Sequence, residues 1–201
     1  MRTRRRWLAL FIALAVPVLV GCNPQQSQFR YAMNLIFSGQ VAAGARMLNT
    51  LAETGHTPSQ FRLALLHELG QGVPRNSRKA AHWFAQAAQQ GDVGGQYGLA
   101  VSYLRGVNGP PDPARAYVEF RKLAERGYAP AAYYVGMAYA EGQGVDRDER
   151  EAVVWLERAA NGGHIEAAKR LAQAYRAGEW GLAADPRAAD KWEQKTQRPR
   201  F

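Results

Sequence analysis

The sequence predicts an all-α protein made of tandem helix–loop–helix units. Two observations lead to this prediction. Residues 130–165 contain the signals of two helices separated by a glycine-rich loop. Shifting this block by 36 residues in either direction superposes it on the flanking sequence without a gap. A fixed period of about 20–50 residues is typical of solenoids, in which each unit buries its apolar face against the next.

Residues 130–165 are predicted to form two helices. Apolar side chains recur at helical spacing up to Tyr139, and the stretch Gly142–Val145 interrupts them. Asp148 is expected to cap the second helix, and Glu151 is expected to complete a capping box by binding the backbone N–H of Asp148. The second helix carries Trp155 on its apolar face and ends at a glycine pair. Neither helix can bury its apolar face alone, so the unit needs a neighbour.

Three kinds of position recur at the 36-residue period. A small residue in the middle of the first helix is expected to let the partner helix approach closely. A glycine after that helix suits a left-handed backbone, where a Cβ atom costs about 1 kcal/mol. A large side chain on the second helix is the third kind of position. Trp83 and Trp155, which lie one position before two members of that column, and Trp192, which belongs to it, are expected to fill the space between turns. The columns are Ala64, Ala100, Gly136 and Ala172; Gly70, Gly106, Gly142 and Gly178; and Phe84, Phe120, Leu156 and Trp192.

These positions resemble the Sel1-like repeat, a relative of the tetratricopeptide repeat. The motif Gly142-Gln-Gly144-Val145, followed by Asp148 and Trp155, matches the family pattern most closely. The loops 106–109 and 178–181 depart from it. The resemblance covers residues 58 to about 196, and it implies a right-handed α-solenoid of helix–turn–helix repeats.

We expect the repeats to divide the chain at regular intervals. Terminal repeats of solenoids are atypical because one of their faces meets solvent. In the divergent first repeat, the helices Gln28–Ser38 and Val41–Thr54 would be joined by a tight turn at Gly39. Near the C-terminus, Asp185 and Pro186 would begin the last helix. The expected units are a divergent repeat at 29–57, Sel1-like repeats at 58–93, 94–129 and 130–165, and a C-terminal capping repeat with a tail at 166–201.

Residues 1–21 are predicted to be a lipoprotein signal peptide. Four arginines precede the apolar run Trp7–Val20, which is shorter than the roughly 20 residues that a membrane-spanning helix needs. The ending Leu19-Val20-Gly21-Cys22 resembles the bacterial lipobox. That resemblance implies a lipidated Cys22 as the first mature residue, with residues 22–28 as lipidated cysteine and linker. An ordinary signal peptide with an incidental cysteine is the alternative.

The residue after the cysteine bears on localisation. Bacterial lipoproteins without Asp at this position are usually sorted to the outer membrane, and here it is Asn23. The resemblance therefore implies an outer-membrane, lipid-anchored protein that faces the periplasm of a Gram-negative bacterium, with the inner membrane as the alternative. Because Cys22 is the only cysteine, a lipidated chain has no thiol left for a disulfide or a zinc site.

Charge does not indicate a nucleic-acid partner. The net charge is +9, and loss of four arginines with the signal would leave +5. Basic and acidic residues are interleaved along the predicted helices, as in Glu149-Arg150-Glu151, which is typical of a solvated surface. No basic cluster is interleaved with aromatic residues in the way that nucleic-acid binding favours.

The sequence contains no recognisable catalytic or metal-binding motif. The four histidines are scattered without ligand spacing, and His67, in a tyrosine column, is expected to be a packed core residue. No serine begins a Ser-x-x-Lys motif, and no phosphate-binding glycine loop is present. We therefore expect no enzyme activity, no cofactor and no metal.

A candidate partner-binding groove follows from the tetratricopeptide layout, which places the first helix of each unit on the concave side. Two columns would then face the groove, and both become polar in the last unit, at Lys169 and Gln173. The alternative is that these side chains are core. The candidate groove residues are Phe61, Leu65, Tyr97, Val101, Tyr133 and Met137.

Two functions are compatible with these features. The first is a membrane-anchored periplasmic adaptor that holds other cell-envelope proteins together through its solenoid surface, in an envelope or exopolysaccharide assembly. The alternative is a peptidoglycan- or β-lactam-interacting protein with weak hydrolase activity. The missing nucleophile–base pair favours the first.

Overall fold

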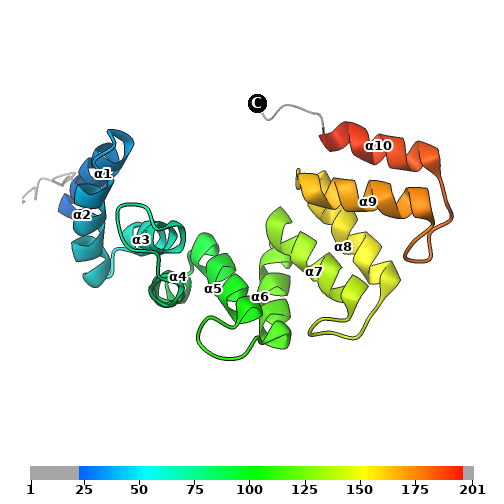
Figure 1. Cartoon of the computed structure of the whole chain (residues 1–201), viewed down its shortest axis with the longest axis horizontal. Helices are drawn as coiled ribbons and strands as arrows, with labels where there is room; N and C mark the ends of the chain where they lie inside the picture. Colours follow the sequence, from blue (N-terminus) through cyan, green and yellow to red (C-terminus); the bar gives the residue numbers. More distant parts are fainter. Residues whose placement is uncertain (1–22, 197–201) are drawn as a thin grey trace, which may run out of the picture.

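The computed structural model describes residues 23–196, which form ten α-helices and no strand. The predicted all-α repeat solenoid is thereby confirmed. Figure 1 shows the helices stacked in chain order into a curved array, with α1 and α10 at opposite ends. The helices are α1 (Pro24–Phe37), α2 (Val41–Glu53), α3 (Thr57–Leu69), α4 (Ser77–Gln89), α5 (Val93–Arg105), α6 (Pro113–Glu125), α7 (Ala129–Glu141), α8 (Glu149–Asn161), α9 (Ile165–Ala177) and α10 (Pro186–Thr196).

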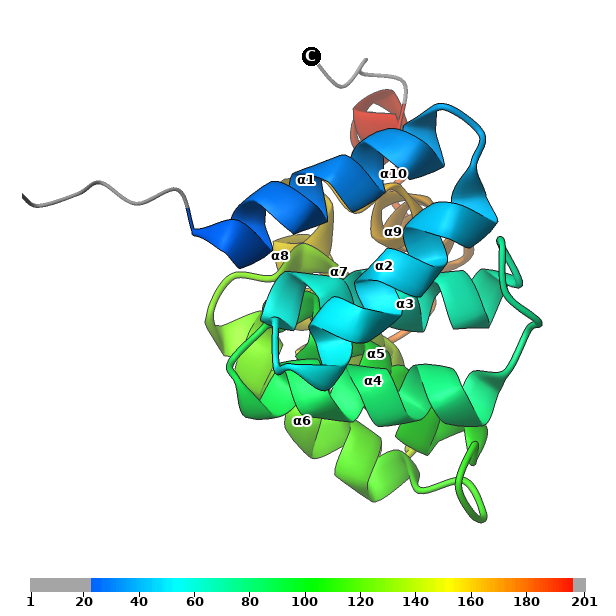
Figure 2. The same cartoon turned by 90° about the vertical axis from the view of Figure 1, so that its left-hand side faces the viewer.

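Packing follows the order of the chain. The helix pairs with extensive contact are consecutive, from α1 with α2 to α9 with α10. Seen from the α1 end, α1 and α2 lie in front and the later helices lie behind them (Figure 2). Each unit therefore covers the apolar face of the one before it, as a repeat solenoid requires.

Small residues allow the helices to approach closely. Ala64 and Ala100 are fully buried, and Ala172 is 2% exposed. At Gly136 an added Cβ atom would lie 2.7 Å from Cγ of Leu156 on α8. The column of small residues is thus a contact line between the paired helices, as predicted from the sequence.

The loop glycines adopt the predicted backbone conformation. Gly70, Gly106, Gly142 and Gly178 follow α3, α5, α7 and α9 as left-handed C-caps, with φ between 65° and 70°. A side chain at these positions would strain the backbone. The same turn therefore begins the loop of each of these four repeats.

The predicted linker at the start of the chain is wrong. Residues 22–28 were expected to be the lipidated cysteine and a linker, but α1 begins at Pro24. The side chain of Asn23 accepts a hydrogen bond from the backbone N–H of Gln25 at 3.0 Å. Asparagine is a good N-cap, and proline suits the first helical position because its missing N–H needs no partner there. Cys22 lies outside the described residues, as do residues 1–21 and 197–201.

Only one of the two hydrogen-bonding interactions of the predicted capping box on α8 is present. Asp148 does cap the helix, since its Oδ1 accepts from the backbone N–H groups of Arg150 at 2.9 Å and Glu151 at 3.1 Å. The Glu151 carboxylate instead accepts from Nε1 of Trp155 at 3.0 Å. The backbone N–H of Asp148 donates to the carbonyl of Tyr139 at 3.1 Å, so it needs no partner from Glu151. At the last helix, Asp185 caps α10 as predicted.

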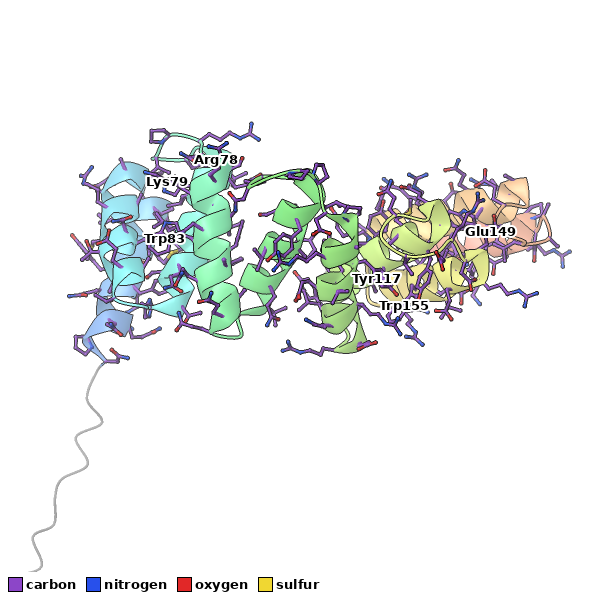
Figure 3. All side chains as sticks on the ribbon, turned by 90° about the horizontal axis from the view of Figure 1, so that it is seen from below. Arg78, Lys79, Trp83, Tyr117, Glu149 and Trp155 are labelled. Atoms are coloured by element: carbon purple, nitrogen blue, oxygen red, sulfur yellow. The ribbon has the colours of Figure 1, made fainter. Side chains whose placement is uncertain are left out.

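Equivalent tryptophans lie in different surroundings. Trp83 on α4 and Trp155 on α8 occupy the same repeat position but separate places along the array (Figure 3). Trp155 is 4% exposed and packs with the core of the later repeats. Trp83 is only half-buried. The repeat position of a side chain therefore does not determine the depth of its burial.

Candidate functional site

A pocket of about 320 Å³ lies between α3 and α5. Four of the six predicted groove residues line it, namely Phe61 and Leu65 from α3 and Tyr97 and Val101 from α5. The other lining residues are Glu68, Phe84, Gly94, Gly98, Ser102, Arg105, Val107 and Tyr128. The pocket thus crosses the boundary between two consecutive repeats, which are neighbours in the array (Figure 1).

Two glycines of α5 line the pocket and allow two of its aromatic rings to lie close to the helix. A Cβ atom on Gly94 would lie 2.5 Å from Cε2 of Phe61, and one on Gly98 would lie 2.5 Å from Cδ1 of Phe84. Both rings therefore rest on bare backbone. At the position of Gly98, the neighbouring repeats carry Arg62 and Tyr134. The repeat pattern does not predict this feature, although glycines inside a predicted helix are a signal for close approach of a neighbouring group.

Tyr97 is both a wall of the pocket and part of the core. Its ring makes edge-on contacts with Phe120 at 5.7 Å, Tyr128 at 5.6 Å and Tyr134 at 6.0 Å between ring centroids. Burial, together with the neighbouring phenol of Tyr134, raises the pKa of Tyr97 well above its usual range. Tyr97 was predicted to face either the groove or the core, and its side chain does both.

The pocket is polar at one end. Nη1 of Arg105 lies 2.6 Å from Oε1 of Glu68, and the Arg105 side chain is 58% exposed against 24% for Glu68. From these two residues the pocket continues into an open depression of about 740 Å³, which Arg75 and Ser77 also line. Two guanidinium groups and one carboxylate therefore surround this end.

The remaining predicted groove residues lie outside the pocket, on α7. The ring of Tyr133 stacks on that of His164 at 4.6 Å and contacts Tyr134 edge-on at 5.6 Å. Met137 is half-buried against the core of the later repeats. On α9 the same columns carry the exposed side chains of Lys169 and Gln173. The apolar surface therefore extends from α3 to α7 and ends there.

The histidines do not gather into a site. His67 is 7% exposed, and its Nδ1 lies 3.4 Å from the carbonyl oxygen of Pro74, which confirms its predicted place in the core. Nδ1 of His56 lies 2.8 Å from Oγ of Ser59, and burial lowers the pKa of His56. Between residues 23 and 196, no group of three His, Cys, Asp or Glu side chains is placed to hold a metal ion. No helix within that range is long and apolar enough to cross a membrane.

Comparison with known proteins supports the repeat architecture. A family model described as Sel1 repeat matches residues 57–92, 93–128, 129–164 and 165–194. No curated protein is significantly similar to the chain.

Among solved structures, a Sel1 repeat protein from Oxalobacter formigenes is similar at 24% identity, over 88% of this chain and 72% of that one, with a TM-score of 0.78. The Escherichia coli protein c5321, a protective antigen present in uropathogenic strains, has a TM-score of 0.76 and 29% identity. This similarity covers 86% of the present chain but only 38% of c5321. A putative Sel1 repeat protein from Klebsiella pneumoniae subsp. pneumoniae is 20% identical, with 84% and 83% covered and a TM-score of 0.50.

Proposed function

The chain belongs to the Sel1 repeat family, and on this premise we propose that it is a membrane-anchored periplasmic adaptor that joins other cell-envelope proteins. Sel1 repeat proteins generally mediate protein–protein interactions. The envelope location and the adaptor role are the parts that this proposal adds. It assigns the binding to the solenoid surface and the attachment to a lipid on Cys22.

The observation that carries the proposal is the pocket between α3 and α5. It is lined mainly by apolar and aromatic side chains, and it ends at the charged pair Arg105 and Glu68. Interfaces draw most of their binding energy from a few buried aromatic and arginine contacts, and a concave apolar surface with a polar rim suits such contacts. A surface of this kind favours capture of a protein segment.

The membrane anchor is supported by the sequence around Cys22. The basic start, the short apolar run and the Leu-Val-Gly-Cys ending are typical of bacterial lipoproteins. Because α1 begins at Pro24, an acyl chain on Cys22 would hold the solenoid close to the bilayer surface, with almost no linker. A triacyl anchor exceeds the two signals that stable attachment needs.

Two measurements test the proposal in cells. The first is metabolic labelling with an alkyne fatty acid, followed by membrane fractionation. Wild-type protein should take the label and sediment with the outer membrane, whereas Cys22→Ser should lose the label. An unlabelled wild-type protein free in solution would overturn the anchor.

The second measurement is site-specific photo-crosslinking in the envelope. A photoreactive residue at Leu65, inside the pocket, should give a discrete crosslink to another envelope protein. The matched control is Val154 on α8, which is 40% exposed and lies outside the pocket lining. Equal crosslinking at both positions would contradict a specific groove. Turnover of nitrocefin by the purified protein would favour the hydrolase alternative instead.

A further inference from the structure

We propose that the pocket between α3 and α5 binds a peptide segment that places an apolar side chain between Phe61 and Tyr97 and a carboxylate on Arg105. This inference rests on the proposed interaction function and deepens it, because it states the chemistry of the partner. The site has an apolar end and a charged end.

The apolar end fits a single large side chain. Its lining includes the aromatic residues Phe61, Phe84 and Tyr97, the aliphatic residues Leu65 and Val101, and the two glycines Gly94 and Gly98. The volume of about 320 Å³ is at the lower limit of ligand pockets, which hold roughly 300–1,000 Å³. Burial of an apolar side chain there removes apolar surface from water, which favours binding.

The other end has excess positive charge. Arg105 and Arg75 line it, and Glu68 is the one carboxylate among its lining residues. Among residues 23–196, Arg75 has no ion-pair partner within 4.0 Å. The surrounding sequence has the same sign, since residues 57–92 hold four Lys and Arg against two Asp and Glu, and residues 93–128 hold five against three. An acidic ligand group is therefore complementary.

The distance between the two ends sets the spacing of the motif. Gly98 and Arg105 are seven residues apart on α5, which is about 10 Å along the helix axis at a rise of about 1.5 Å per residue. An extended peptide covers about 3.3 Å per residue. The acidic residue should therefore lie about three positions from the apolar anchor.

The ion pair between Arg105 and Glu68 in the free protein predicts opposite changes in peptide affinity when one or the other charge is removed. Glu68 occupies Arg105 at 2.6 Å, so a ligand carboxylate competes with Glu68 for the guanidinium group. Removing the charge of Glu68 should then tighten binding, whereas removing that of Arg105 should weaken it. A ligand with a basic group would show the opposite signs.

The experiment is a selection from a phage library of random dodecapeptides against the full-length protein in detergent. Enriched peptides should carry Asp or Glu two to four positions from Phe, Trp, Leu or Ile. By fluorescence anisotropy, these peptides should bind Arg105→Gln about tenfold more weakly or worse, since a charge-assisted hydrogen bond is lost. They should bind Glu68→Gln several-fold more tightly. Arg121→Gln is the matched control, because Arg121 also sits in an exposed ion pair, with Glu125 at 3.0 Å, outside the pocket.

Three kinds of outcome would overturn the inference. The first is enrichment of basic peptides that Glu68→Gln weakens. The second is binding that Arg105→Gln leaves unchanged, or no enrichment at all. The third is concentration-dependent self-association that Arg105→Gln abolishes, which would assign the pocket to a second copy of the chain. If crosslinking at Leu65 still captures an envelope protein, the proposed function survives the failure of this inference.

Discussion

The ring of Phe84 lies directly on the backbone of Gly98, so that a Cβ atom on Gly98 would fall 2.5 Å from Cδ1 and 2.6 Å from Cγ of the ring. Phe84 is 6% exposed and belongs to the core of the repeat at α3 and α4. One missing side chain therefore has two consequences. It lets the phenylalanine complete the packing between repeats, and it sets the position of a ring that lines the pocket.

Replacing Gly98 by Ala should destabilise the protein and narrow the pocket. Overpacking a core costs about 1–3 kcal/mol, while alanine in a helix interior recovers up to about 1 kcal/mol relative to glycine. We expect a net loss of about 1 kcal/mol in the free energy of unfolding, measured by urea denaturation. The control is Gly109→Ala, because nothing lies within 4 Å of a Cβ atom there, and this change should stay within about 0.5 kcal/mol of wild type. A stabilised Gly98→Ala would show that Phe84 moves freely.

Periodicity made most of the fold predictable. The 36-residue shift located the helices, the left-handed glycines and the small-residue column, because the same local physics acts in each unit. The periodicity did not predict side-chain interactions that depend on which residues lie nearby in the folded structure. Glu151 was expected to bind the backbone N–H of Asp148. Its carboxylate instead accepts a hydrogen bond from the indole N–H of Trp155, one turn further along α8.

The candidate site was predictable only in part. The two columns that begin at Phe61 and at Leu65 were recognised, because the tetratricopeptide layout assigns them to one side. The shape of the pocket depends on Gly94 and Gly98, which have no side chain and let two rings lie close to α5. These two glycines do not recur at the repeat period, so the repeat pattern does not predict them. The ion pair between Arg105 and Glu68 joins residues in successive repeats, so it appears only once the repeats are packed.

Truncation of Trp155 should be among the most costly changes in the chain. Its ring is 4% exposed, its Nε1 donates to Glu151, and the guanidinium of Arg158 lies 4.4 Å from the ring centroid. We expect Trp155→Ala to lower the free energy of unfolding by about 3–5 kcal/mol, as for other buried aromatic residues. Trp83→Ala, at the equivalent but half-buried position, should lose roughly half as much. Equal losses in urea denaturation would mean that burial does not set the cost.

Mild acid should weaken the fold through His56. Burial lowers the pKa of this imidazole below its ordinary 6.5, and the ring of Phe29 lies 5.3 Å away. The unfolded chain therefore binds a proton more readily than the folded one as the pH falls through about 6.5. Stability should be full above that pH and should decrease below it, until the folded imidazole also protonates. Urea denaturation at several pH values between 8 and 5 measures this decrease.

The variant His56→Asn isolates the contribution of His56 to the pH dependence. Asparagine is a good N-cap for α3 and does not titrate. The variant should keep more of its pH 8 stability at pH 5 than the wild type does. An identical pH dependence in both proteins would show that the loss of stability in acid comes from titratable groups other than His56.

The loop of the repeat at 129–164 rests on the start of α6, and Gly144 is the contact point. Its φ is +79°, and a Cβ atom would lie 2.3 Å from the carbonyl oxygen of Pro113, a backbone atom that cannot move aside alone. Gly163 has a similar φ of +86° but nothing within 4 Å. Gly163→Ala should therefore cost only the backbone strain, about 1 kcal/mol, whereas Gly144→Ala should add the steric term and cost about 2–4 kcal/mol. Equal losses of the two variants in urea denaturation would show that the loop can move away from α6 at no cost in free energy. The contact at Gly144 would then not contribute to the stability of the array.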